Sequence, residues 1–167
     1  MSMEHGGEGE PGRRAGRNGN AFERILLPGL ETAGYRWLKG IPDDDSEPVE
    51  SRIPFFIPRW YGKHLRTLAG TLLVPDYYVW HAAKYPMGCL VECKWQQSSG
   101  TVDEKIYYRL HSLLQTGLPA VLALGGAKFR KALLVYYKRF DNSAEGGNLR
   151  VFVSTDDLIV AMNKGLF

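Results

Sequence analysis

The chain has 167 residues, of which 44% are hydrophobic and 23% charged, and its formal net charge is +3. These values are ordinary for one soluble globular domain. They exclude a membrane-spanning helix, because no apolar run approaches the ~20 residues that a span requires. The N-terminus also lacks the apolar core of a signal peptide, so we expect a cytoplasmic protein with no membrane partner.

The charge is distributed unevenly along the chain. Residues 1–20 balance to zero, residues 41–50 contain five acids and no base, and residues 51–167 contain 15 Lys and Arg against 8 Asp and Glu. A basic body is what a protein that binds a polyanion needs. A surplus of this size, taken alone, is more typical of a mildly basic protein that binds no polyanion.

Residues 1–18 predict a disordered tail, because they are rich in Gly, Glu and Arg and almost without apolar side chains. A single domain over residues 19–167 is expected to follow. It opens with a helix that begins at Ala21, since Asn20 is a favoured cap residue and apolar residues then recur at helical spacing. Glu23 stands at the third position, where an acidic side chain can complete the cap.

Residues 38–70 are the least regular part of the sequence. Two prolines within residues 52–62 predict an edge strand or an irregular segment. The stretch that follows mixes aromatic and basic side chains. It either contacts DNA, through Lys63 and Arg66, or contributes to the core and its rim.

Residues 71–80 and 88–96 predict two strands, paired antiparallel across a turn at residues 81–88 that holds Pro86 and Gly88. Successive side chains of a strand point to opposite faces. One face of the second strand therefore carries Cys89, Val91, Cys93 and Trp95, and the other carries Leu90, Glu92, Lys94 and Gln96. The two cysteines are too far apart to bridge and too few for zinc, so we expect buried thiols.

Asp76 lies at the end of the first of these strands, so it can meet Glu92 and Lys94 at one point. Two carboxylates can hold a divalent cation, and a neighbouring ammonium suits the polarisation of a phosphodiester. The alternative is a half-buried strand whose polar face is solvated, with Glu92 and Lys94 as a weak surface pair. For an isolated Glu-X-Lys that alternative is the commoner one.

The second half of the chain predicts further alternation of helices and strands. A capped helix from Thr101 is followed by an apolar strand at 118–124, typical of the middle of a sheet. Residues 128–140 hold five bases and no acid and fit either a helix or a strand, with Lys128, Arg130 and Lys131 as candidate DNA contacts. A strand at 149–154 and a helix that ends at Gly165 complete an α/β domain with a central sheet and helices on both faces.

Three segments, taken in this order, resemble the PD-(D/E)XK nuclease superfamily, which includes many restriction endonucleases and Holliday-junction resolvases. They are residues 19–35 with Glu23, residues 74–79 with Asp76, and residues 91–96 with Glu92, Lys94 and Gln96. The resemblance spans about residues 19–160 and implies a restriction-endonuclease-like αβββαβ core. Pro28 departs from the pattern, and we expect it to kink or shorten the opening helix.

The resemblance also implies a site and an activity. Asp76, Glu92, Glu23 and the backbone carbonyl of Cys93 would hold a metal ion, and Lys94 and Gln96 would complete the catalytic set. Oxygen ligands favour Mg²⁺, for which Mn²⁺ should substitute. We therefore expect a metal-dependent endonuclease that hydrolyses duplex or branched DNA as a homodimer, because two strands are most simply cut by two-fold related sites. The alternative is a non-catalytic module on the same fold that binds nucleic acid or protein.

Overall fold

The computed structural model describes residues 22, 24–38, 53–59, 65–96, 102–126 and 129–167. The predicted tail, the cap at Asn20 and the cap at Thr101 lie outside the described residues. So do three candidate functional residues, which are Glu23, Lys63 and Lys128.

Within the described residues, a six-stranded mixed sheet forms the centre, and its strands lie side by side in chain order. The strands are β1 (Arg36–Trp37), β2 (Phe55–Pro58), β3 (Tyr77–His81), β4 (Tyr85–Trp95), β5 (Ala120–Gly125) and β6 (Leu149–Phe152). Strands β2, β3 and β4 pair antiparallel, whereas β4, β5 and β6 pair parallel. The short strand β1 adds a parallel edge to β2.

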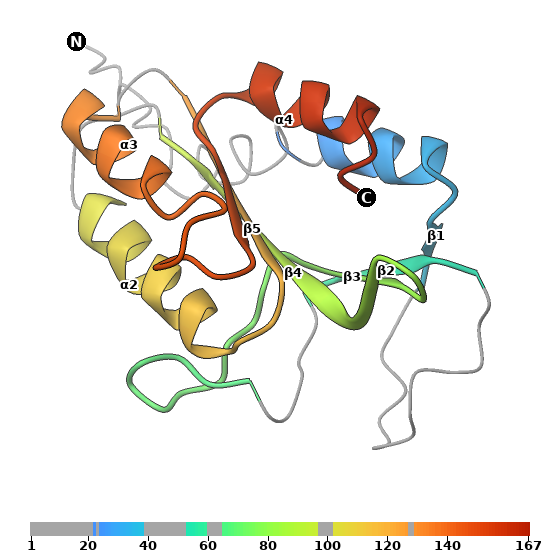
Figure 1. Ribbon diagram of the computed structural model, residues 1–167, viewed down its shortest axis with the longest axis horizontal. Helices are drawn as coiled ribbons and strands as arrows, with labels where there is room; N and C mark the ends of the chain where they lie inside the picture. Colours follow the sequence, from blue (N-terminus) through green and yellow to red (C-terminus); the bar gives the residue numbers. More distant parts are fainter. Residues whose placement is uncertain (1–21, 23, 39–52, 60–64, 97–101, 127–128) are drawn as a thin grey trace, which may run out of the picture.

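Helices cover both faces of this sheet. They comprise residues 24–32 and three helices named α2 (Val102–Gln115), α3 (Lys131–Lys138) and α4 (Thr155–Asn163). Figure 1 shows α2 and α3 together on one face and α4 beside the N-terminal helix on the other. Because parallel strands need a crossover, α2 connects β4 to β5 and α3 connects β5 to β6. The predicted restriction-endonuclease-like α/β fold is confirmed.

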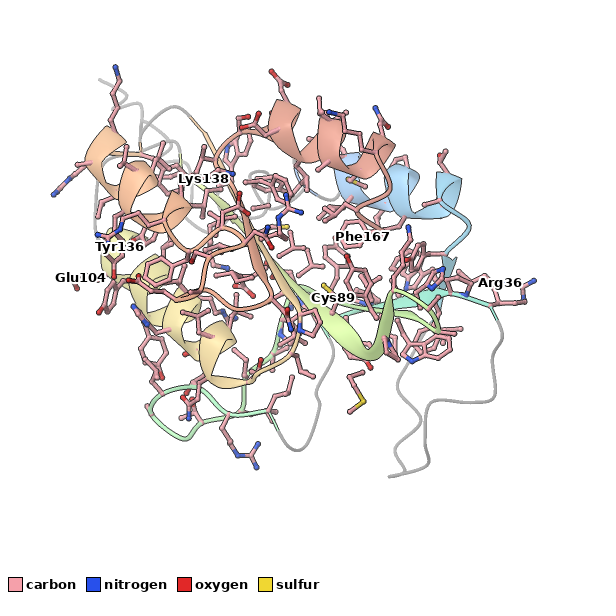
Figure 2. The ribbon with its side chains drawn as sticks, in the orientation of Figure 1. Arg36, Cys89, Glu104, Tyr136, Lys138 and Phe167 are labelled. Atoms are coloured by element: carbon pink, nitrogen blue, oxygen red, sulfur yellow. The ribbon has the colours of Figure 1, made fainter. Side chains whose placement is uncertain are left out.

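Each face of the sheet has its own hydrophobic core, and β4 contributes to both. Leu90 joins the core under α2 and α3, whereas Cys89 and Val91 join the core under α4 and the N-terminal helix. The predicted alternation along β4 is therefore confirmed. Neither cysteine is in a disulfide. Cys89, which is labelled in Figure 2, is buried, and Cys93 is half-buried.

The turn between β3 and β4 is shorter than residues 81–88, which the sequence predicted. Strand β4 begins at Tyr85, and the ring nitrogen Nδ1 of His81 accepts hydrogen bonds from the amides of Ala83 and Lys84. Gly88 lies inside β4 with φ of +87°, beside an irregular register, and a Cβ there would lie 2.2 Å from the Tyr78 ring. A glycine that suggested a turn instead permits a bulge in the strand.

Two further predictions are changed by the sheet. The prolines predicted an edge strand or an irregular segment over residues 52–62. Residues 55–58 of that range instead form β2, which is paired on both sides, with β1 and with β3, so for these residues the prediction was wrong. The proline at the end of β2 is tolerated because a strand terminus needs fewer ladder hydrogen bonds. Strand β3 begins only at Tyr77, because residues 65–73 form a small hairpin of their own, bridged between Arg66 and Leu72.

The ambiguous segment 128–140 forms a helix in its described part. Tyr137 of α3 is buried, and Leu133 and Leu134 pack against the same core. Helix α4 starts as predicted, with the Ser154 side chain accepting from the amide of Asp157. Across the described ranges, no helix combines the length and the apolar character that crossing a membrane would require.

Candidate active site

The site lies where β4 meets the segment that leads into β3. Asp76 directly precedes β3, and its Oδ2 accepts a hydrogen bond from the backbone amide of Cys93 at 2.8 Å. This bond crosses from one strand to its antiparallel neighbour and fixes the Asp76 side chain beside β4. The backbone therefore brings Asp76 to the same place as the side chains of Glu92 and Lys94.

The ammonium of Lys94 sits among three oxygen atoms. It forms an ion pair with Oε1 of Glu92, donates to the carbonyl oxygen of Cys93 at 3.3 Å, and lies 3.8 Å from Oδ2 of Asp76. These three oxygens belong to three of the groups that the resemblance implied as metal ligands. The Lys94 side chain itself is 29% exposed, so solvent reaches this point of the site.

Glu92 is the buried centre of the site. Its side chain has no exposed surface. Burial, and next the negative charge of Asp76, raise the pKa of Glu92 above its ordinary value, although Lys94 and Arg109 act in the opposite direction. Both cations contact the same oxygen, Oε1, whereas Oε2 has no hydrogen-bond partner within the described part of the chain.

Arg109 is a member of this site that the sequence reasoning missed. It lies on α2, where its Nε donates to Oε1 of Glu92 at 2.8 Å and its Nη2 donates to the carbonyl of Val74 at 2.9 Å. A signal was present in the sequence. Arg109 follows Ile106 by three residues and precedes Leu113 by four, which places it on the inward face of the helix.

The remaining candidates are dispersed. Gln96 is buried just after β4, and its backbone amide donates to the backbone carbonyl of Gly125 at 2.9 Å. Arg66 lies exposed on the hairpin of residues 65–73, and Arg130 and Lys131 lie exposed at the beginning of α3. Neither the hairpin nor α3 carries Asp76 or Glu92. The described groups that contact one another are Asp76, Glu92, Lys94, the Cys93 backbone and Arg109.

The chemistry of this set fits a hard divalent cation. Oε2 of Glu92 is a buried acceptor that receives no hydrogen bond from any described residue, and the neighbouring oxygens already surround the positive charge of Lys94. Among the described residues, no three His, Cys, Asp or Glu side chains gather for a metal. The ligands available there are therefore two carboxylates and one carbonyl, all oxygen donors of the kind that Mg²⁺ prefers.

The fold and this arrangement define a protein of the restriction-endonuclease-like class. The match to a known family is more specific: residues 14–164 match the family model of a PD-(D/E)XK nuclease superfamily domain. The chain belongs to that superfamily, whose proteins are generally nucleases that use divalent metal ions. No curated protein and no solved structure matches the chain.

Proposed function

We propose that the chain is a metal-dependent endonuclease that hydrolyses DNA phosphodiester bonds. One observation carries the proposal, namely that Asp76, Glu92 and the Cys93 carbonyl surround a single point, which the ammonium of Lys94 occupies. An arrangement that already stabilises one positive charge is suited to a divalent cation. A strand with a merely solvated polar face would not bury Glu92 completely.

The proposed metal is Mg²⁺, with Mn²⁺ as a substitute, held by Asp76, Glu92 and the Cys93 carbonyl, and by Glu23 as a further ligand. When bound, it would activate a water molecule and neutralise charge on the phosphate. Lys94 would donate to a phosphate oxygen, as a cation aimed at developing charge does. Gln96, buried just after β4, would orient the attacking water.

Five cations are proposed to hold the DNA backbone. Arg66, Arg130 and Lys131 are exposed members of this group, and Lys63 and Lys128, which lie outside the described residues, are its further members. Contacts of this kind set position and salt dependence rather than sequence specificity. We propose a homodimer as the functional unit, because one such site cuts one strand and duplex DNA has two.

A nicking assay on supercoiled plasmid tests the proposed function. The purified chain should nick the plasmid with Mg²⁺ or Mn²⁺ and not in EDTA. Asp76→Asn and Glu92→Gln should each lower the rate by ~10² or more, with DNA binding retained. Glu145→Gln is the matched control, because it removes an exposed carboxylate outside the site. A chain that binds DNA and never cuts it would be a binding module instead.

A further inference from the structure

Arg109 joins the two chain segments that carry the carboxylates of the site. Its guanidinium bonds Glu92 on β4 through Nε and the carbonyl of Val74 through Nη2. Val74 precedes Asp76 by two residues. A single side chain on α2 therefore fixes the position of both segments relative to each other.

From this geometry we propose that Arg109 is a positioning residue, which holds the Glu92 carboxylate through Oε1 while Lys94 is free to turn to the substrate. This inference rests on the proposed function. Of the two cations that contact Glu92, Arg109 stays with the carboxylate and Lys94 leaves it. Lys94 and Arg109 both contact Oε1 of Glu92. One of the two is enough to anchor the carboxylate, so the other can leave it.

The two cations differ in how firmly they are held. Arg109 has a planar guanidinium with two hydrogen bonds to two different segments, one of them to a backbone carbonyl that cannot rotate away. Lys94 presents a compact ammonium on a flexible stem, and this charge can turn without breaking a bidentate arrangement. If Lys94 moves to a phosphate oxygen, Arg109 remains to compensate the buried charge of Glu92.

The same geometry assigns different tasks to the two oxygens of Glu92. Oε1 receives both cations, and Oε2 has no donor within the part of the chain that the structure describes. A carboxylate anchored through one oxygen presents the other in a fixed direction. Partners that orient a metal ligand in this way typically change metal affinity by 10–100-fold when they are removed.

Mn²⁺ binding measured by calorimetry, together with thermal melting in EDTA, tests the inference. Arg109→Gln should weaken Mn²⁺ binding by about 10–100-fold and slow single-turnover cleavage, at a temperature where the variant is fully folded. Arg109→Lys should recover only part of the affinity, since an ammonium cannot bond both Glu92 and Val74. Lys105→Gln is the matched control, an exposed cation one turn earlier on α2, and it should leave Mn²⁺ affinity unchanged.

A second comparison separates positioning from simple support of the fold. Arg109→Gln should be made both in the wild-type chain and in the Glu92→Gln variant, and melting measured in EDTA. The substitution should lower the melting temperature more in the wild-type chain, because only that chain has a buried Glu92 carboxylate whose charge Arg109 compensates. An Arg109→Gln chain that melts early but binds Mn²⁺ as tightly as wild type would reduce Arg109 to a structural contact. A wild-type chain that neither binds Mn²⁺ nor cleaves would overturn the proposed function, and the inference with it.

Discussion

Glu92 is the residue on which the site depends, because it is an acid placed where an acid is unfavourable. Full burial disfavours its charged form and raises its pKa. Lys94 and Arg109 compensate this penalty in part, through ion pairs with the same oxygen. Because a buried ion pair is weak evidence for a gain in stability, the arrangement of Glu92 between two cations supports its proposed role in the site.

The raised pKa of Glu92 predicts a pH-dependent stability. A group whose pKa is higher in the folded state stabilises the fold below its ordinary pKa, and this contribution is lost as the pH rises through the folded value. Glutamine does not titrate, so the wild type should lose stability relative to Glu92→Gln as the pH rises above the ordinary carboxyl pKa. Melting temperatures of both chains, measured in EDTA at a series of rising pH values, check the prediction. A difference that stays constant with pH contradicts it.

Removing Lys94 should separate cleavage from metal binding. Lys94→Met deletes the ammonium that sits among the three oxygens, so Mn²⁺ should bind as tightly as in wild type or more tightly. Cleavage should nevertheless fall by ~10² or more, as loss of a transition-state charge partner does. Lys94→Arg should not restore the rate, because the guanidinium is wider and planar. Wild-type cleavage by Lys94→Met would remove Lys94 from the mechanism.

At the level of elements, the end of α3 is attached to β6 through one carboxylate. Asp141 accepts from Lys138, which is labelled in Figure 2, from Nε of Arg150 at 3.0 Å and from the amide of Val151 at 2.9 Å. Burial raises the pKa of Asp141, but these three bonds outweigh burial and hold the pKa below its ordinary value. Three donors on one acceptor should make this contact important for stability.

Asp141→Asn should therefore destabilise the fold by about 1.5–3 kcal/mol, the range for hydrogen bonds to charged groups. The exposed Glu145→Gln in the same loop is the control and should change stability little. Because the pKa of Asp141 is lowered by folding, its contribution is present above the ordinary carboxyl pKa and is lost as the pH falls through the folded value. Urea unfolding at pH 7 and at pH 3 should show the Asp141→Asn deficit shrinking at the lower pH.

Local patterns were sufficient for some elements and insufficient for others. The alternation of residues 89–96 placed Glu92 and Lys94 on one face, because a strand has only two faces to choose from. The contact of Arg109 with Glu92 was not predictable from local pattern alone, since it depends on how α2 docks on the sheet. Gly88 suggested a turn, whereas the structure needs a glycine there because the Tyr78 ring fills the adjacent space. That ring comes from the neighbouring strand, so the local pattern around Gly88 could not reveal it.

At the scale of the whole molecule, exposed basic residues lie on helices that cover opposite faces of the sheet. Arg130 and Lys131 begin α3, which lies on the same face as α2, whereas Arg24 lies in the helix on the opposite face (Figure 1). A net charge of +3 alone did not distinguish a DNA-binding protein from any basic one. The position of the charges allows a sharper test.

The dependence of DNA binding on salt should report which cations contact phosphates. Arg130→Gln and Lys131→Gln should each reduce the log–log slope by roughly one unit, because each phosphate contact releases about one counterion. Arg24→Gln removes the same charge from the other face and should leave the slope unchanged. Equal slopes for all three variants and the wild type would assign Arg130 and Lys131 to an ordinary solvated surface.

The described charges of the site cancel, since Asp76 and Glu92 balance Lys94 and Arg109. A divalent cation added to a neutral site leaves a surplus of two positive charges, which a phosphodiester can partly offset. Metal and DNA should then bind cooperatively, and thermodynamic linkage requires each to tighten the other by the same factor. Mn²⁺ titrations with and without a hydrolysis-resistant phosphorothioate duplex would measure that factor. With the proposed metal and substrate, such a site should release its metal readily when no DNA is bound and should hold the cation firmly only when a DNA strand is present.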